Sequence, residues 1–155
     1  MWRIAAILVV AAALPAGAQM RLDMTAPANR GVVRAFEDFW KKKDDKSRQP
    51  LGCDVRQVGP GLGFDLRMWS GYAFTIPLTD FKGQKQARLS AVIKVEPLEP
   101  AGEPVYLGRR LTVPGIPDDP SKKLYISAGG GFSLGAGRYR ASLLIADSRN
   151  RSCMK

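Results

Sequence analysis

The chain has 155 residues with 24 lysines and arginines against 14 acidic residues, which gives a formal net charge of +10. It contains no histidine, and this excludes Ser-His and Cys-His nucleophilic catalysis as well as histidine-based zinc and copper sites. The basic excess favours anionic partners, but the cationic residues are too scattered to form a nucleic-acid-binding arm, so we expect no specific nucleic-acid ligand.

Residues 1–18 have the three zones of a secretory signal peptide. Arg3 lies in a basic start, Ile4 to Leu14 are apolar, and Ala16-Gly17-Ala18 forms a small-residue cleavage site before Gln19. The apolar run is shorter than the roughly 20 residues that a membrane-spanning helix needs, and no later segment is apolar for long enough. We therefore predict an exported protein, periplasmic or extracellular; an uncleaved N-terminal anchor is the alternative. Cleavage would lower the side-chain charge to +9, because Arg3 is the only charged residue removed.

Large apolar residues recur at helical intervals between residues 30 and 43, behind a predicted helix cap at Asn29. The stripe consists of Val32, Val33, Phe36, Phe39 and Trp40. A helix of this length is marginal alone in water, so the stripe must pack on something. It packs either on its own domain or on a partner protein. In the second case Val33, Phe36, Phe39 and Trp40 are the docking residues.

From Cys53 onward the apolar period becomes two, which is typical of β-strands. The predicted strands cover residues 53–58, 62–69, 72–78, 88–96, 105–113, 123–128, 139–146 and 151–155. Turn-forming residues separate them, at positions 59–61, 80–84, 97–104, 114–120, 129–131 and 147–150. The pattern predicts an all-β antiparallel sandwich of about seven or eight strands. We divide the chain into a signal peptide (1–18), an N-terminal helical segment and linker (19–50) and a β-sandwich domain (51–155).

The segment from Gly135 to Asp147 resembles the late strands of immunoglobulin-like and fibronectin-type sandwiches. A turn glycine, Gly137, precedes Tyr139, alternating apolar residues and a polar hairpin. The resemblance covers about thirteen residues and implies an immunoglobulin-like fold, with no particular activity. The two cysteines lie near the first and last strands, whereas the bridge of antibody domains joins two interior strands.

Cys53 and Cys153 are the only cysteines of the chain. Export places them in an oxidising compartment, so we predict one disulfide bond between them. The alternatives are two free thiols or an intermolecular link.

We find no convincing catalytic, cofactor or metal site in the sequence. The only Ser-x-x-Lys pair, Ser152 and Lys155, stands at the chain end, and on a strand its members would face opposite sides. A pair of carboxylates could serve a glycosidase-type hydrolase, but the sequence does not reveal their separation. We therefore predict a non-catalytic protein without a cofactor, and retain a carboxylate-based hydrolase as the least favoured alternative.

Basic and aromatic residues occupy the outward phase of several predicted strands. If they share one face, cations would attract an anionic polymer while the rings stack on sugars or bases. The residues predicted to form this anionic-ligand face are Arg67, Trp69, Arg88, Lys94, Tyr106, Arg110, Tyr125 and Arg140. The alternatives are that they divide between two outer sheet faces, or that the N-terminal helix covers Trp69.

These observations lead to two hypotheses for a non-catalytic exported module. The favoured one is an interaction or structural domain whose partner is another envelope or secreted protein. The other is a binder of anionic polysaccharide or lipid.

Overall fold

The computed structural model describes residues 19–45, 48–63, 66–120 and 123–155. The predicted signal peptide at residues 1–18 lies outside the described residues, as do Phe64 and Asp65 of the predicted strand 62–69. The elements in chain order are β1 (Met20–Arg21), α1 (Pro27–Lys41), β2 (Asp54–Leu62), β3 (Met68–Pro77), the 3-10 helix η1 (Leu78–Phe81), β4 (Gln86–Glu99), β5 (Val105–Pro114), β6 (Tyr125–Leu134), β7 (Arg138–Asp147) and β8 (Ser152–Met154).

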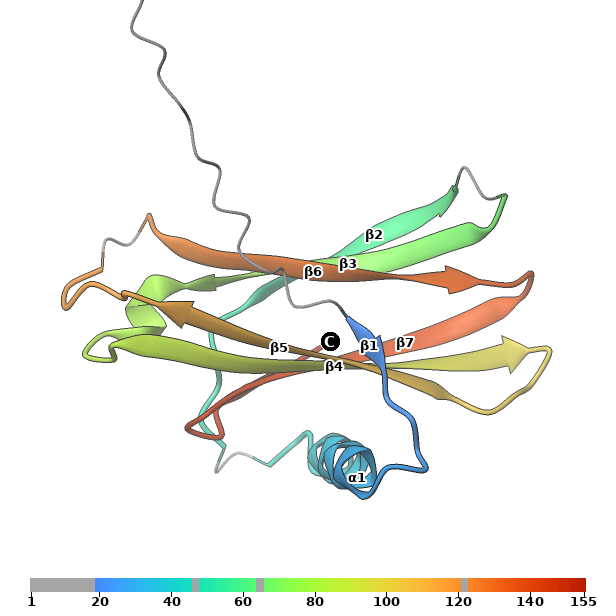
Figure 1. Ribbon diagram of the computed structural model, residues 1–155, viewed down its shortest axis with the longest axis horizontal. Helices are drawn as coiled ribbons and strands as arrows, with labels where there is room; N and C mark the ends of the chain where they lie inside the picture. Colours follow the sequence, from blue (N-terminus) through green and yellow to red (C-terminus); the bar gives the residue numbers. More distant parts are fainter. Residues whose placement is uncertain (1–18, 46–47, 64–65, 121–122) are drawn as a thin grey trace, which may run out of the picture.

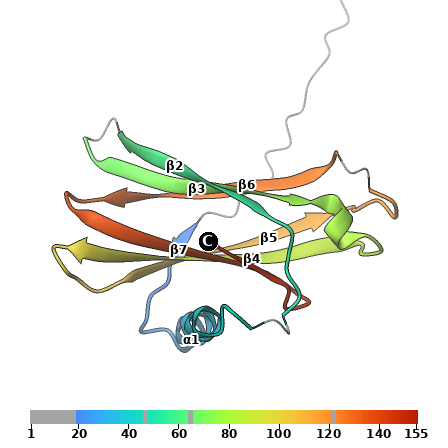
Figure 2. The ribbon, with the colours of Figure 1, turned by 180° about the vertical axis from the view of Figure 1, so that it is seen from behind.

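The strands form two antiparallel sheets stacked face to face, which confirms the predicted all-β sandwich (Figure 1). One sheet has five strands in the order β1-β5-β4-β7-β8, and the other has three in the order β2-β3-β6. Seen from behind, the three-stranded sheet again lies above the five-stranded one (Figure 2). Part of the segment 19–50 belongs to this architecture, because β1 pairs with β5 at one edge of the larger sheet.

The main core fills the space between the sheets. In three strands the side chains that point into this core are those expected from the apolar alternation. They are Tyr72 and Ile76 of β3, Leu89 and Ile93 of β4, and Ile145 of β7. Alternation places every second side chain on the inner face of a strand, and this is why a period of two identified them.

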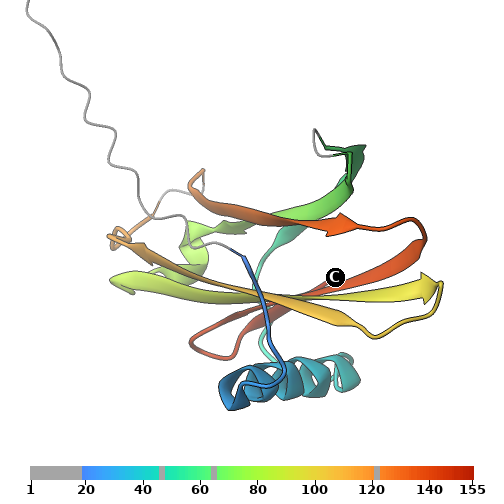
Figure 3. The same cartoon turned by 45° about the vertical axis from the view of Figure 1, so that its right-hand side comes forward.

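The helix α1 lies outside the sandwich, on the face of the five-stranded sheet that points away from the other sheet (Figure 3). It begins at Pro27, and proline is suited to this position because an N–H in the first turn would have no hydrogen-bond partner within the helix. The predicted cap at Asn29 is therefore wrong: Ala26 is the N-cap, and the Asn29 side-chain amide donates to the Asp23 carbonyl at 2.9 Å.

Two glycine-containing segments that we predicted as turns are strand instead. Residues 59–61 continue β2 through a shift of register between Val58 and Gly61, and residues 129–131 lie inside β6. At Gly129 an added Cβ would stand 2.4 Å from the Tyr72 carbonyl oxygen of β3. Glycine is needed there for close approach of two strands rather than for a turn.

The predicted strand at residues 62–69 is also wrong, because here a predicted strand is mostly a connection between strands. β2 ends at Leu62 and β3 begins at Met68, so most of the alternating run is the connection of a hairpin. Its described apolar side chains point into solvent, and the alternation therefore does not reflect a buried face.

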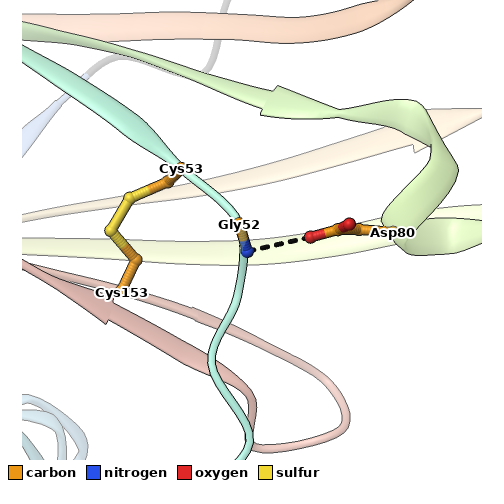
Figure 4. Close-up of a disulfide and its surroundings, with 4 residues drawn as sticks. All are labelled: Gly52, Cys53, Asp80 and Cys153. Carbon is orange, nitrogen blue, oxygen red and sulfur yellow. Dashed lines mark hydrogen bonds between the residues drawn. A yellow bond between two sulfur atoms is a disulfide. The ribbon is translucent and has the colours of Figure 1, made fainter. Parts of the chain in front are cut away.

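Cys53 and Cys153 form a disulfide, as predicted, and this bond ties the chain next to β2 to the five-stranded sheet (Figure 4). Cys53 stands just before β2 of the smaller sheet, and Cys153 lies within β8 of the larger one. The neighbouring Gly52 amide donates to Asp80 Oδ2 at 2.9 Å, which fixes the same segment to η1.

Candidate ligand groove between the helix and the sheet

The basic and aromatic residues of the predicted anionic-ligand face are divided between the two sheets, which is one of the two alternative arrangements. Trp69 of β3 and Tyr125 of β6 belong to the three-stranded sheet, and Arg67 lies in the connection before β3. The remaining members are on strands of the five-stranded sheet, namely Arg88, Lys94, Tyr106, Arg110 and Arg140. A period of two identifies the outward side chains of each strand but carries no information about the sheet to which that strand belongs.

Two of these residues attach the helix to the sheet. The Tyr106 ring is buried edge-on against Phe36, with ring centroids 5.8 Å apart. Its hydroxyl donates to Glu37 Oε1 at 2.5 Å, and Lys94 Nζ lies 3.1 Å from the same oxygen. Tyr106 and Lys94 therefore contribute to the packing of α1 and are not a free binding face. Arg140 in turn pairs with Glu96 at 3.6 Å.

This contact changes the acidity of both of its hydrogen-bonded members. The hydrogen bond from Tyr106, helped by the charge of Lys94, holds the pKa of Glu37 below its ordinary value of 4.5. Burial, together with the hydrogen bond to Glu37, raises the pKa of Tyr106 above its ordinary value of 10.0. The pair is consequently a tyrosine hydroxyl donating to a carboxylate throughout the neutral range.

The predicted docking stripe of the helix packs mainly on its own protein. Val33 and Phe36 are buried in a second core with Val92, Tyr106 and Leu144 of the sheet. Phe36 retains 1% exposure, so neither it nor Val33 is accessible to a partner. Of the four predicted docking residues, Phe39 and Trp40 stay partly exposed.

A second helical stripe borders a groove between α1 and the sheet. Ala28, Val32, Ala35 and Phe39 follow one another at intervals of four, three and four, so they share one side of the helix. They line a groove of about 730 Å³, together with Phe36, Val92 and Leu144. The apolar surface of α1 is thus wider than the strip that the sheet covers.

Small residues on the facing sheet explain why the groove stays open. Ser90 of β4, Gly108 of β5 and Ala146 of β7 all line it. Ser90 and Ala146 are cross-strand partners in the outward phase, and Gly108 pairs with Val92 beside them. At Gly108 an added Cβ would stand 2.9 Å from the side chain of Leu22, which packs over this glycine.

Arginine side chains border the groove on the exposed part of the sheet. Arg110 lines the groove directly and is the cross-strand partner of Ser90. Arg88 lies diagonal to Arg110 on the adjacent strand, in the same outward phase. Both are exposed, and neither forms an ion pair with any residue that the structure describes. The sequence predicted these two cations as ligand-binding residues; it did not reveal the apolar groove beside them.

Two further cavities lie between the sheets, with volumes of about 370 and 530 Å³. Neither of them, nor the groove, is lined by an aspartate or glutamate. Among the described residues no group of three or more metal-ligating side chains comes together. The acidic pair that the hydrolase hypothesis requires is therefore absent from these three cavities. Within the same residues, no helix has the length and apolar character of a membrane-crossing segment.

Comparisons with known proteins do not identify a family. No protein-family model matches the chain, and a search of curated proteins finds no match. Among solved structures, the X-ray structure of Northeast Structural Genomics Consortium target SoR45 aligns with a TM-score of 0.39 and 11% identity, over 69% of this chain and 81% of that chain. This level of similarity carries no functional argument.

Proposed function

We propose that this protein is an exported, non-catalytic binding module whose ligand is an amphiphilic anion, that is, an acyl chain with a negatively charged head group. The acyl chain lies in the groove between α1 and the five-stranded sheet, and the head group meets Arg110 and Arg88. The observation that carries the proposal is the position of an apolar groove beside two arginines that have no acidic partner among the described residues.

The size and chemistry of the groove support this choice. Its volume of about 730 Å³ lies within the range of small-molecule sites, roughly 300–1,000 Å³. Val32, Phe39 and Leu144 offer the apolar wall that a hydrocarbon chain requires. A guanidinium can hold a carboxylate or phosphate through two parallel hydrogen bonds, which suits the two arginines to an anionic head group.

The extracytoplasmic location is part of the same proposal. Its support is the signal-peptide pattern of residues 1–18 and the disulfide, which is compatible with an oxidising compartment. A ligand that is poorly soluble in water would gain from a carrier or receptor in such a compartment.

The test is displacement of a fluorescent fatty acid by oleate, measured on the wild type and on Ala35→Trp. Ala35 is exposed on the helix and lines the groove, so an indole there occupies the space of the ligand while leaving the core unchanged. We expect Ala35→Trp to weaken oleate binding at least about tenfold, because it displaces several buried methylene groups of about 0.8 kcal/mol each. Ala136→Trp, which places the same side chain at an exposed turn that lines none of the three cavities, is the matched control.

The role of the arginines is tested separately with Arg110→Gln. This variant should bind oleate about tenfold more weakly and an uncharged long-chain alcohol as well as the wild type does, because a charge-assisted hydrogen bond contributes about 1.5–3 kcal/mol. Arg56→Gln, at an exposed arginine of β2 that is paired with Asp54, is the control. Equal oleate affinity of all variants would refute the proposal.

Docking of another envelope or secreted protein is the competing proposal. It now has weaker support, because two of the four predicted docking residues, Val33 and Phe36, are buried, and Phe39 and Trp40 are only partly exposed. A partner protein retained by the wild type, lost with Ala35→Trp and not displaced by oleate would favour this function over lipid binding.

A further inference from the structure

The end of the β2–β3 hairpin carries a concentrated group of exposed apolar side chains. Half of the eight large apolar residues that are exposed in the described chain occur here, within eight positions. They are Leu62, Leu66, Met68 and Trp69, with exposed fractions of 63%, 80%, 40% and 41%. We call this group the apolar hairpin end. Such a concentration of exposed apolar side chains indicates contact with an apolar partner.

The hairpin end projects beyond the rest of the sandwich. Figure 1 shows the connected ends of β2 and β3 rising away from the five-stranded sheet. Met68 and Trp69 are consecutive strand residues, so their side chains point to opposite faces. Both are nevertheless exposed, and it follows that no second layer made of the described residues covers either face of the hairpin at this end.

The backbone at Leu66 is unusual for its residue type. Its φ is 59°, in the left-handed region that glycine and asparagine prefer, and its side chain has the highest exposed fraction of the group. This conformation is unfavourable for a leucine, and leaving the side chain in water offers no burial in return. A cost of this kind is expected where the exposed side chain has a function.

Trp69 is held in a defined position on the smaller sheet. Its cross-strand partner is Gly61, and an added Cβ at Gly61 would stand 3.2 Å from the indole Nε1. The ring therefore lies over a glycine, with part of its surface still exposed. A partly buried indole with a polar N–H is the side chain that favours the boundary between lipid head groups and acyl chains.

We propose that the apolar hairpin end inserts into the surface of a membrane that contains anionic lipids. A fluid lipid surface can cover both faces of a projecting hairpin, whereas a protein partner would need a cleft shaped to receive it. The net charge of +10 attracts the protein to anionic head groups, and Arg67 lies in sequence between Leu66 and Met68. The proposal does not depend on the groove, although a membrane is also the natural source of an acyl ligand.

The test is co-sedimentation with vesicles of phosphatidylcholine alone and of phosphatidylcholine mixed with phosphatidylglycerol. We expect binding to the mixed vesicles, reduced at least about tenfold by the double variant Leu66→Ser/Trp69→Ser, because each lost side chain contributes about 1.5–3 kcal/mol when buried. The matched control is Leu124→Ser/Tyr125→Ser. It removes two exposed apolar residues at the opposite end of the same sheet, where Tyr125 pairs with Pro77. All four positions are exposed, and thermal unfolding verifies that both variants are folded.

A second measurement locates the contact. In a Trp40→Phe background, Trp69 is the only tryptophan after signal cleavage, since the other one is Trp2. Its emission should shift to the blue with mixed vesicles and be quenched by lipids that carry bromine on the acyl chain. Vesicle binding that both double variants reduce equally, or that leaves Trp69 unquenched, would overturn the proposal in favour of charge attraction alone. Absence of vesicle binding would overturn it as well.

Ligand binding in the groove and membrane insertion of the hairpin end can be tested independently. The hairpin variants should leave oleate binding in solution unchanged, and Ala35→Trp should leave vesicle binding unchanged, because the groove and the hairpin belong to different sheets. If oleate binding responds to Ala35→Trp but vesicle binding does not respond to the hairpin variants, the membrane inference alone is wrong. The reverse pattern refutes the groove proposal alone.

Discussion

Glu37 is the polar contact through which the helix meets the sheet. It accepts a hydrogen bond from the buried Tyr106 and pairs with Lys94, and each partner comes from a different strand of the sheet. Sequence patterns identified Lys94 and Tyr106 as outward residues of their strands but not their common partner, because that partner lies on another element 57 or more residues away. A carboxylate with these two donors orients α1 on the sheet.

The lowered pKa of Glu37 predicts a pH-dependent contribution to stability. Since the folded-state pKa lies below the ordinary value of 4.5, the ionised form stabilises the fold at pH above about 4.5. This stabilisation is lost as the pH falls through the folded-state value. With 31% of the side chain exposed, we expect Glu37→Gln to lower the free energy of unfolding at pH 7 by about 1 kcal/mol at most.

Urea denaturation between pH 7 and pH 3 checks this prediction. The difference between the wild type and Glu37→Gln should shrink in the acid range below about pH 4.5. Glu103→Gln, at an exposed glutamate in the β4–β5 connection, removes the same charge and should differ little from the wild type at any pH. A constant difference for Glu37→Gln across the range would contradict the proposed role.

At the scale of elements, α1 has two apolar stripes with different tasks. Val33 and Phe36 pack into the second core, whereas Val32 and Phe39 line the groove. The helical period of the sequence placed all these residues in one stripe, because residues of neighbouring stripes, such as Val32 and Val33, are adjacent in sequence. The sheet distinguishes the two stripes. Val92 and Leu144 contact the first stripe, whereas the small residues Ser90 and Ala146 leave space beside the second.

Substitutions in the two stripes should therefore have different consequences. We expect Phe36→Ala to lower the free energy of unfolding by about 3–5 kcal/mol, because it removes a ring that is 1% exposed and packed in the second core. Phe39→Ala should cost only about 1–2 kcal/mol, because the side chain is partly exposed already. Chemical denaturation gives both values, and equal losses would show that the second stripe is packed as tightly as the first.

The errors in predicting strands have two physical causes. Glycine allows a tight turn, but it also allows two strands to approach closely, as Gly71 and Gly129 do between β3 and β6. Alternating apolar residues indicate a buried face only if another layer covers them, and at the β2–β3 hairpin end no layer does. The strands β4, β5 and β7, which were predicted well, belong to the larger sheet, whose inner face lies in the main core and whose outer face is partly covered by α1.

At the scale of the molecule, the disulfide joins the two sheets across a sequence separation of 100 residues. Its existence followed from the cysteine count and the predicted export, whereas its place between the sheets required the strand order. The same limit applies to the predicted anionic-ligand face, whose residues the strand order assigns to two sheets. Only Arg88 and Arg110 of that set remain together beside a cavity.

Removal of the disulfide should destabilise the whole sandwich. For a closed loop of this length, we expect Cys53→Ser/Cys153→Ser to lower the free energy of unfolding by about 2–5 kcal/mol. The wild type in reductant should approach the double variant, and reductant should not affect the variant. An unchanged denaturation midpoint in both cases would contradict a stabilising role of this bond.

Methyl NMR can show directly whether a fatty acid binds between α1 and the five-stranded sheet. During titration with decanoate, we expect the largest chemical-shift changes at Val32, Val92 and Leu144, whose side chains line the groove. Val95 and Leu134, which line both cavities between the sheets, should change little. Saturation without shifts at the groove methyls, or shifts confined to Val95 and Leu134, would contradict the claim that the ligand lies between α1 and the five-stranded sheet.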